Sequence, residues 1–176
     1  ATTEIYTLSL HDALPIFECQ KDRTSLDLEN AVYPEYLIHW DSPSGKLHIA
    51  GQIDLLVKKG NSIIIGDWKT NKKIDTKSYF DSKVRSSVKM KFPLNNLDDC
   101  NYYHYCLQLS TYAYIIESYN PDFSIEDLVL VHFDHNDNMT VYHLPYLRKE
   151  VERMLSYYEK EHLLQERRLK NKRIEY

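Results

Sequence analysis

The chain is poor in cysteine and has no long apolar run. Its three cysteines, Cys19, Cys100 and Cys106, form neither an even set of disulfide partners nor a paired CxxC zinc pattern, which indicates a reducing cytoplasm. Three thiols also exclude a four-cysteine iron–sulfur cluster held by this chain alone. No apolar run approaches the roughly 18 residues that a membrane helix needs, so we expect a soluble protein with no membrane partner.

The rest of the composition is ordinary for a globular domain. The 176 residues are 43% hydrophobic and 27% charged, with a formal net charge of −4, so one domain with a real core is expected. Residues 1–17 lack the basic start and the cleavage site of a signal peptide and show no clear period. They resemble translated adapter sequence, so we interpret 1–17 as a non-native or disordered stretch and expect a single domain over residues 18–176.

The basic residues are concentrated in two segments. Residues 69–91 hold eight Lys or Arg against two Asp, and residues 148–173 hold nine against five Glu. Together they contain 17 of the 22 basic residues. Such runs usually form solvated surface, and two phosphate-facing patches on an otherwise acidic protein are the functional alternative.

Hydrophobic patterning predicts alternating strands and helices. We expect strands at residues 35–40, 46–59, 62–70, 127–134 and 139–144, a loop at 71–101, and helices at 18–30, 102–119 and 146–170. One face of the helix at 102–119 carries Cys106, Leu109, Ala113 and Ile116, and Asn120-Pro121 ends it. This order favours an α/β fold with a mixed central β-sheet flanked by helices.

Residues 51–70 read as a hairpin that contains charges. If Gly60-Asn61 forms a two-residue turn, opposed residues have numbers that sum to 121, so Asp54 faces Asp67. Strict alternation predicts one apolar face, made of Ile53, Leu55, Val57, Ile64 and Trp68. The other face would carry Leu56, Ile63 and Ile65 near the turn, then Gln52, Asp54, Asp67 and Lys69.

Two opposed carboxylates need compensation for their repulsion. Their Cβ atoms would lie about 5 Å apart, where unit charges repel by roughly 3 kcal/mol at an effective dielectric near 20. A raised pKa on one aspartate, an ion pair with Lys69, or a divalent cation could offset this. Carboxylate oxygens suit Mg²⁺ or Mn²⁺, so we favour the cation, with a structural Asp67–Lys69 ion pair as the alternative.

Three motifs in this order, GQID (51–54), GDWKT (66–70) and QLSTY (108–112), resemble the PD-(D/E)XK nuclease superfamily in its RecB-like branch. The segments 90–105 and 130–155 are similar to nuclease-like proteins of Bacteroides-type phages and prophages. The resemblance runs from residue 33 to 160 and implies a restriction-endonuclease-like αβββαβ core. It also implies a DNA nuclease of phage or prophage origin in the bacterial cytoplasm, working in DNA replication or recombination with phage proteins of those processes.

The same resemblance implies a metal site. Asp54 and Asp67 would bind Mg²⁺ (or Mn²⁺) together with the Trp68 backbone carbonyl, and Lys69 would be the catalytic lysine that helps to activate water. Glu35, in YPEY, matches an acidic residue that family members carry before the first strand, so it is a candidate third ligand. The helix that usually precedes this strand would fall within residues 1–30.

The resemblance also implies contacts with DNA. Gln108 and Tyr112 lie four residues apart on one helix face and match the branch motif that faces the site, so Gln108 joins the catalytic set. A basic segment would hold the phosphate backbone, and binding should then weaken as salt rises. The predicted DNA-binding residues are Tyr112, Lys72, Lys73, Lys77, Lys83, Arg85, Lys89 and Lys91.

Other clusters have simpler interpretations. HFDHNDN (132–138) has the composition of a metal loop, but its position between two strands favours a solvated hairpin tip. Cys100, His104 and Cys106 are too few for a closed zinc site. The tyrosines of the helix at 102–119 are expected to be mostly core, although one or two rings could stack on unpaired bases.

Three hypotheses of function follow. The leading one is a Mg²⁺-dependent DNA nuclease, with exonuclease or endonuclease action and the form of the nucleic acid left open. The second is a catalytically inactive nucleic-acid-binding module of the same fold. The third is an unrelated globular domain in which Asp67 and Lys69 form a structural ion pair.

Overall fold

The structure of the protein, a computed structural model, describes residues 26, 29–82, 85–136 and 138–174. The segment 1–17, most of the helix predicted at 18–30, and Lys83 lie outside the described residues.

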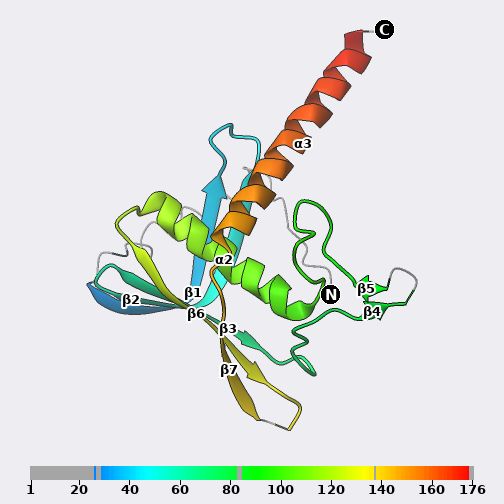
Figure 1. Ribbon diagram of the computed structural model, residues 1–176. Coiled ribbons are helices and arrows are strands. Elements are labelled where there is room, and N and C mark those ends of the chain that lie inside the picture. Colours follow the sequence, from blue (N-terminus) through cyan, green and yellow to red (C-terminus); the bar gives the residue numbers. More distant parts are fainter. Residues whose placement is uncertain (1–25, 27–28, 83–84, 137, 175–176) are drawn as a thin grey trace.

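A five-stranded mixed sheet forms the centre of the fold (Figure 1). In sheet order its strands are β1 (Asn30–Asp41), β2 (His48–Lys59), β3 (Ser62–Lys69), β6 (Ser124–Phe133) and β7 (Met139–His143). β3 and β6 run parallel, and the other neighbouring pairs are antiparallel. The predicted α/β class with a mixed central sheet is confirmed.

Two helices complete the fold. α2 (Asn101–Tyr119) lies across the sheet, and α3 (Arg148–Ile174) begins beside α2 and then projects away from the body (Figure 1). The predicted apolar face of α2 is confirmed, since all four of its residues are buried. The helix ends where predicted, with the Asn120 N–H bonded to the Ile116 carbonyl at 3.0 Å. No helix in the described ranges is both long and apolar enough to cross a membrane.

The main core lies between the sheet and α2. Leu56, Ile63 and Ile65 of the hairpin are fully buried, as is Leu109 of α2. Each such side chain contributes about 1.5–3 kcal/mol by leaving water. The polar exception on α2 is Ser110, which is 0% exposed and accepts a hydrogen bond from the Leu147 N–H at 2.9 Å. This bond ties α2 to the segment that leads into α3.

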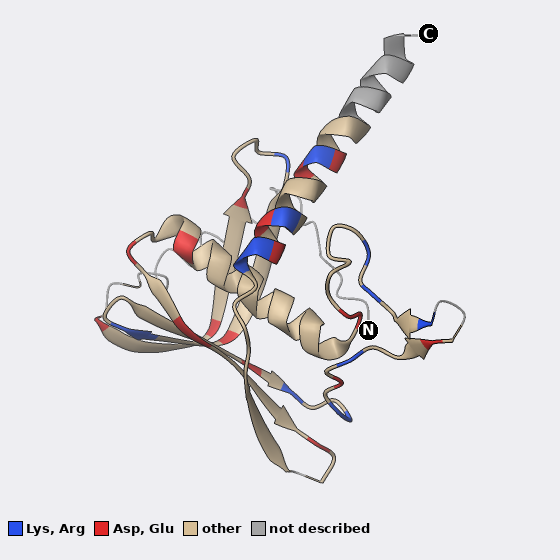
Figure 2. Cartoon of the chain, in the orientation of Figure 1, with Lys and Arg blue, Asp and Glu red and all other residues tan. Residues whose placement is uncertain are grey.

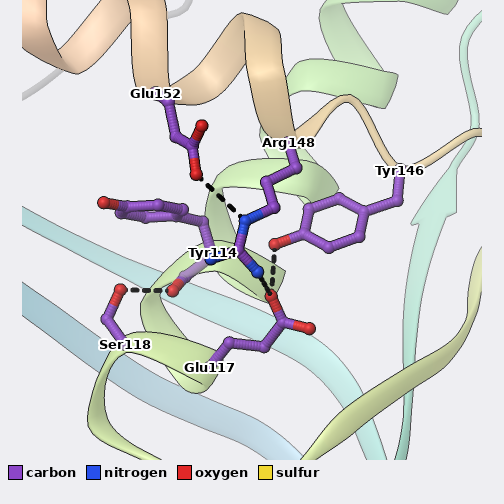
Figure 3. Close-up of polar contacts among 6 residues, drawn as sticks. All are labelled: Tyr114, Glu117, Ser118, Tyr146, Arg148 and Glu152. Atoms are coloured by element: carbon purple, nitrogen blue, oxygen red, sulfur yellow. Dashed lines mark hydrogen bonds and ion pairs between the residues drawn. The ribbon is translucent and has the colours of Figure 1, made fainter. Parts of the chain in front are cut away.

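A group of polar contacts fixes α2 against α3 (Figure 3). Arg148 at the start of α3 bonds Glu117 of α2 at 2.7 Å and Glu152 at 3.0 Å, and its guanidinium lies over the Tyr114 ring. The Tyr146 hydroxyl also donates to Glu117 at 2.7 Å. Burial, with the adjacent Glu117 carboxylate, raises the pKa of Tyr146, so this hydroxyl stays a proton donor at neutral pH.

The segment predicted as a loop at 71–101 has structure of its own. It contains a small hairpin of β4 (Phe80–Asp81) and β5 (Ser86–Ser87). A second core of Met90, Leu94, Leu97 and Leu107 anchors its return path against α2 and α3. We call residues 70–100 the arm, because Figure 1 shows β4 and β5 extending from the body beyond the beginning of α2.

The alternation of buried residues breaks in the middle of β1 and β2. Ile53 and Leu56 are 1% and 0% exposed although they lie three residues apart, so the strict alternation predicted for the hairpin is wrong on this point. The pairing of β1 with β2 omits Glu35 and Asp54, and Glu35 has a φ of +53°. This left-handed residue turns β1 locally, which allows both halves of β2 to bury side chains against α2.

The predicted apolar face of the hairpin is also corrected. Leu55, Val57 and Ile64 are half-buried and Trp68 is 45% exposed. The core of the hairpin is instead the face with Leu56, Ile63 and Ile65, which is the face that ends in Asp67. The charged cluster therefore lies at the edge of the main core.

Candidate active site

The β2–β3 hairpin has the predicted register. Its paired residues run from Lys59–Ser62 to Leu55–Gly66, and every pair of numbers sums to 121. Asp54 and Asp67 are the next residues beyond the last pair. The Trp68 N–H donates to Asp54 Oδ2 at 3.0 Å, so the Asp54 carboxylate is bonded to the backbone between Asp67 and Lys69.

Asp67 is a buried carboxylate with a lysine beside it. It is 3% exposed, and its Oδ2 forms an ion pair with Lys69 Nζ, whose side chain is 22% exposed. Beyond this ion pair, Asp67 Oδ2 accepts no hydrogen bond of good geometry from the described residues. The carboxylate is thus desolvated, and one lysine alone compensates it at this oxygen.

Two of the three compensations expected from the sequence are present together. Burial raises the pKa of Asp67, and the Asp54 charge raises it further, while the hydrogen bond and charge of Lys69 lower it. The net shift is upward, so desolvation outweighs the lysine. A carboxyl group with a raised pKa beside a partly buried lysine is typical of functional sites, although structural ion pairs can show it as well.

α2 contributes a polar face opposite Asp67. Tyr105, Gln108 and Tyr112 lie three and four residues apart, which places them on one side of the helix. Lys69 Nζ lies over the Tyr105 ring, 5.1 Å from its centroid, and Gln108 Nε2 donates to the Tyr112 hydroxyl at 3.1 Å. Burial raises the pKa of Tyr112, and the charges of Asp67 and Asp54 add to the shift.

Gly51 provides the space for Tyr112. A Cβ added at Gly51 would lie 2.7 Å from Tyr112 Cε1 and 3.3 Å from its hydroxyl. Real Cβ atoms do not approach a ring this closely, so no larger residue fits without displacing the tyrosine. The glycine of the GQID motif therefore has a steric role three residues before Asp54.

Glu35 lies apart from the two aspartates. It is exposed, and its carboxylate accepts a hydrogen bond from Gln52. No group of three or more His, Cys, Asp or Glu side chains in the described ranges is arranged to hold a metal ion. The structure thus brings together Asp54, Asp67 and Lys69 but not Glu35.

His132 supports the chain that follows Lys69. It is 5% exposed on β6, and it pairs with Lys69 across the parallel strands. Its Nε2 lies 2.6 Å from the Asn71 carbonyl oxygen, so the ring donates a hydrogen bond to the backbone there. This contact fixes the direction in which the arm leaves the site.

The predicted DNA-binding residues follow the arm on the surface. Lys72, Lys73, Lys77, Arg85, Lys89 and Lys91 are all exposed. Lys73 and Lys89 form ion pairs with Asp75 and Asp98, at 2.7 and 2.5 Å. Figure 2 shows lysine and arginine spread along the arm, whereas α3 carries basic and acidic residues in alternating bands.

Within the described residues, the two other clusters form no group arranged to hold a metal ion. Asp134 caps the β6–β7 turn by accepting bonds from the Asn136 and Asn138 N–H groups at 2.8 and 3.0 Å, as expected for a hairpin tip. Cys106 is 0% exposed, whereas His104 is exposed and bonds Asp99 at 2.8 Å. Cys106 therefore lies in the core, whereas His104 lies at the surface.

The donor set at the end of β3 fits a hard divalent cation. Mg²⁺ binds through one or two carboxylates and keeps several waters, and Asp54 with Asp67 supplies two. The buried Asp67 Oδ2, with Lys69 as its one partner, is an oxygen that a cation would stabilise. The soft ligands that favour zinc or copper are missing from this cluster of described residues.

Comparisons with known proteins give distant likenesses only. No protein-family model and no curated protein matches the chain. The crystal structure of SSO0001 is 17% identical with a TM-score of 0.39, over 79% of this chain and 52% of that one. The crystal structure of the "Putative exonuclease" of Eubacterium rectale is 12% identical with a TM-score of 0.47, over 86% and 51%. The chain spans about half the length of these two proteins.

Sequence reasoning missed three residues around the site. Tyr105 lies three residues before Gln108, so helical spacing could have identified it. Gln52, whose backbone hydrogen-bonds Tyr112, lies two residues before Asp54, and the sequence pattern placed it only on the polar face of the hairpin. His132 was noted only as part of the HFDHNDN segment, because its contact with the site depends on β6 lying beside β3.

Proposed function

We propose that this protein is a Mg²⁺-dependent DNA nuclease that hydrolyses phosphodiester bonds, with a role in phage DNA replication or recombination. The observation that carries the proposal is the buried Asp67–Lys69 ion pair with Asp54 held beside it through the Trp68 N–H. A fold that needed only stability would gain by replacing these buried charges with apolar residues.

Asp54 and Asp67 are the residues that would hold the cation. A bound Mg²⁺ would polarise the phosphate and supply a water of lowered pKa. The protein's own contribution is to fix its donors before substrate arrives. Asp54 is fixed by the Trp68 N–H and Asp67 by burial at the edge of the main core.

Lys69 would act on the phosphate or on the attacking water. Its ammonium group lies between the Asp67 carboxylate and the Tyr105 ring, and 22% of its side chain is exposed, so it can reach a phosphate from solvent. There it would orient the attacking water or stabilise the negative charge that develops on phosphorus. Gln108, held by Tyr112, offers a further polar group from α2.

Cleavage of end-labelled DNA tests the proposal. The protein is incubated with Mg²⁺ or Mn²⁺ and with linear or circular DNA, single-stranded or duplex, and the product lengths are read on a gel. Asp67→Asn should abolish cleavage, and Lys69→Met should slow it by about 10²-fold or more, the scale of losing one group that stabilises the transition state. Removing one partner of a buried ion pair destabilises a fold, so circular dichroism must first show that each variant is folded before its cleavage is compared.

Two matched controls lie away from the site. Asp41→Asn removes an exposed aspartate on β1, and Lys59→Met an exposed lysine on β2. Both should cleave like the unmodified protein. Failure to cut any substrate with either metal ion, or equal activity of Asp67→Asn and Asp41→Asn, would show that the enzyme proposal is wrong.

The alternative function is a catalytically inactive nucleic-acid-binding module. The exposed basic residues of the arm favour binding on their own account. This alternative predicts salt-dependent DNA binding with no cleavage. Under the third hypothesis, a structural ion pair, neither binding nor cleavage would be seen.

A further inference from the structure

The β4–β5 hairpin presents aromatic rings to solvent. Tyr79 is 73% exposed, the highest value among the large hydrophobic side chains of the described residues, and Phe80 beside it is 66% exposed. Burying a ring of this size would contribute about 1.5–3 kcal/mol to stability. The fold gives up that contribution at two consecutive positions.

The hairpin stands on an anchored base. The Met90 N–H bonds the Leu97 carbonyl at 3.0 Å, and the Asp99 N–H bonds the Val88 carbonyl at 3.0 Å. The side chains of Ser87 and Lys89 both bond Asp98, at 3.1 and 2.5 Å. The second core includes residues of this base. The two exposed rings are therefore carried by an ordered part of the chain.

Both ends of the arm adjoin the candidate active site. At one end the Asn71 carbonyl accepts a bond from His132, whose strand neighbour is Lys69. A few residues further along the arm, Lys73 and Asp75 contact Asn101 at the start of α2. The Asn101 side chain donates to the Lys73 carbonyl at 2.9 Å and accepts from the Asp75 N–H at 2.7 Å. α2 then carries Gln108, so the arm leaves the site from β3 and returns to it through α2.

Among the described residues next to the two rings in the sequence, two are basic and one, Asp81, is acidic. Lys77 and Arg85 are exposed and flank β4 and β5, and Figure 2 shows further basic positions along the arm. Exposed rings combined with basic groups are the usual means of binding an unpaired strand, because bases stack on the rings while the cations follow the phosphates. In a duplex the base faces are covered by their neighbours, so the rings would have nothing to stack on.

We propose that Tyr79 and Phe80 bind unpaired bases, so that the arm selects single-stranded DNA for the candidate active site. This inference rests on the proposed nuclease function. Tyr79 directly precedes β4 and Phe80 is its first residue, so two neighbouring rings are available for stacking.

Fluorescence anisotropy tests the inference without cleavage. Fluorescein-labelled oligothymidylate of about 20 nucleotides, long enough to exceed the usual site size, is compared with a duplex of equal length, both in EDTA. Tyr79→Ala/Phe80→Ala should weaken binding of the single strand by about fivefold to 150-fold for each base that loses its ring, and binding of the duplex by less than twofold. Tyr79→Phe, which keeps the ring, should bind as the unmodified protein does.

Two further variants test whether loss of charge, or loss of any exposed ring, has the same effect on binding. Lys77→Ala/Arg85→Ala should weaken binding of both probes and reduce the salt dependence. Tyr119→Ala removes a ring that is 54% exposed at the far end of α2 and should change neither affinity. Equal losses for both probes in the double aromatic variant, no loss at all, or the same loss in Tyr119→Ala would overturn the inference.

The outcome is independent of catalysis. If Asp67→Asn abolishes cleavage but the aromatic variant binds both probes normally, the arm inference fails and the proposed function stands. If the aromatic variant loses single-strand binding but no DNA is cut, the nuclease proposal fails instead. A concentration-dependent dimer that dissociates in Tyr79→Ala/Phe80→Ala would identify the rings as a protein interface and contradict the inference.

Discussion

Replacing Gly51 by alanine should displace Tyr112 and destabilise the fold. The new Cβ would lie 2.7 Å from Tyr112 Cε1, so the ring must move by about 0.7 Å to reach the 3.4 Å of an ordinary contact. That movement strains the hydrogen bond from Gln108 to the tyrosine hydroxyl, now 3.1 Å long. Overpacking of this kind costs about 1–3 kcal/mol of the free energy of unfolding.

A double-mutant cycle isolates the contact. Urea unfolding is followed by circular dichroism for Gly51→Ala, Tyr112→Ala and the combined variant. Gly51→Ala should cost about 1–3 kcal/mol in the unmodified chain and close to nothing in the Tyr112→Ala background, where the methyl group enters vacated space. The matched control is Gly66→Ala on β3, whose added Cβ would meet Leu55 rather than Tyr112.

The cycle has a clear refuting result. The cost of Gly66→Ala should be the same in both Tyr112 backgrounds, within about 0.5 kcal/mol. If Gly51→Ala also costs the same in both backgrounds, then Tyr112 does not lie against Gly51, and the arrangement of α2 over β2 described above is wrong.

Two further predictions concern α2. Burial raises the pKa of the Cys106 thiol to about 12 from its usual 9.0; the folded thiol holds its proton more tightly than the unfolded one, so stability should fall as pH rises above about 9. Urea midpoints at several pH values should fall less steeply for Cys106→Ala, and equal slopes would contradict this. Ser110→Ala leaves the part-buried Leu147 N–H without its acceptor and should cost about 1–3 kcal/mol. An unchanged melting temperature in calorimetry would refute this.

Local sequence signals correctly predicted the register of the β2–β3 hairpin and the end of α2. The Gly60-Asn61 turn fixed the register of β2 against β3, since a two-residue turn leaves one choice of partners. Asn120-Pro121 fixed the end of α2. The register predicted that Asp54 faces Asp67, whereas Gln108 and Tyr112 were predicted from the resemblance to the nuclease superfamily.

Long-range packing decided what local signals could not. Ile53 and Leu56 are both buried, against strict alternation, because Glu35 on the neighbouring strand takes a left-handed conformation that β2 alone does not reveal. The arm was predicted as a loop because its apolar residues, Met90, Leu94 and Leu97, are too scattered to show a period. They become buried only through packing against α2 and α3. His132 reached the site through the parallel pairing of β6 with β3.

We propose that Asp54 and Asp67 bind one divalent cation together. Calorimetric titration with Mn²⁺ tests it most directly. The unmodified chain should bind the ion, Asp67→Asn and Asp54→Asn should each lose the binding heat, and Lys69→Met should keep or strengthen it, because Lys69 competes for the Asp67 carboxylate. Equal Mn²⁺ binding by Asp67→Asn and the unmodified chain, or no binding by the latter, would contradict the account.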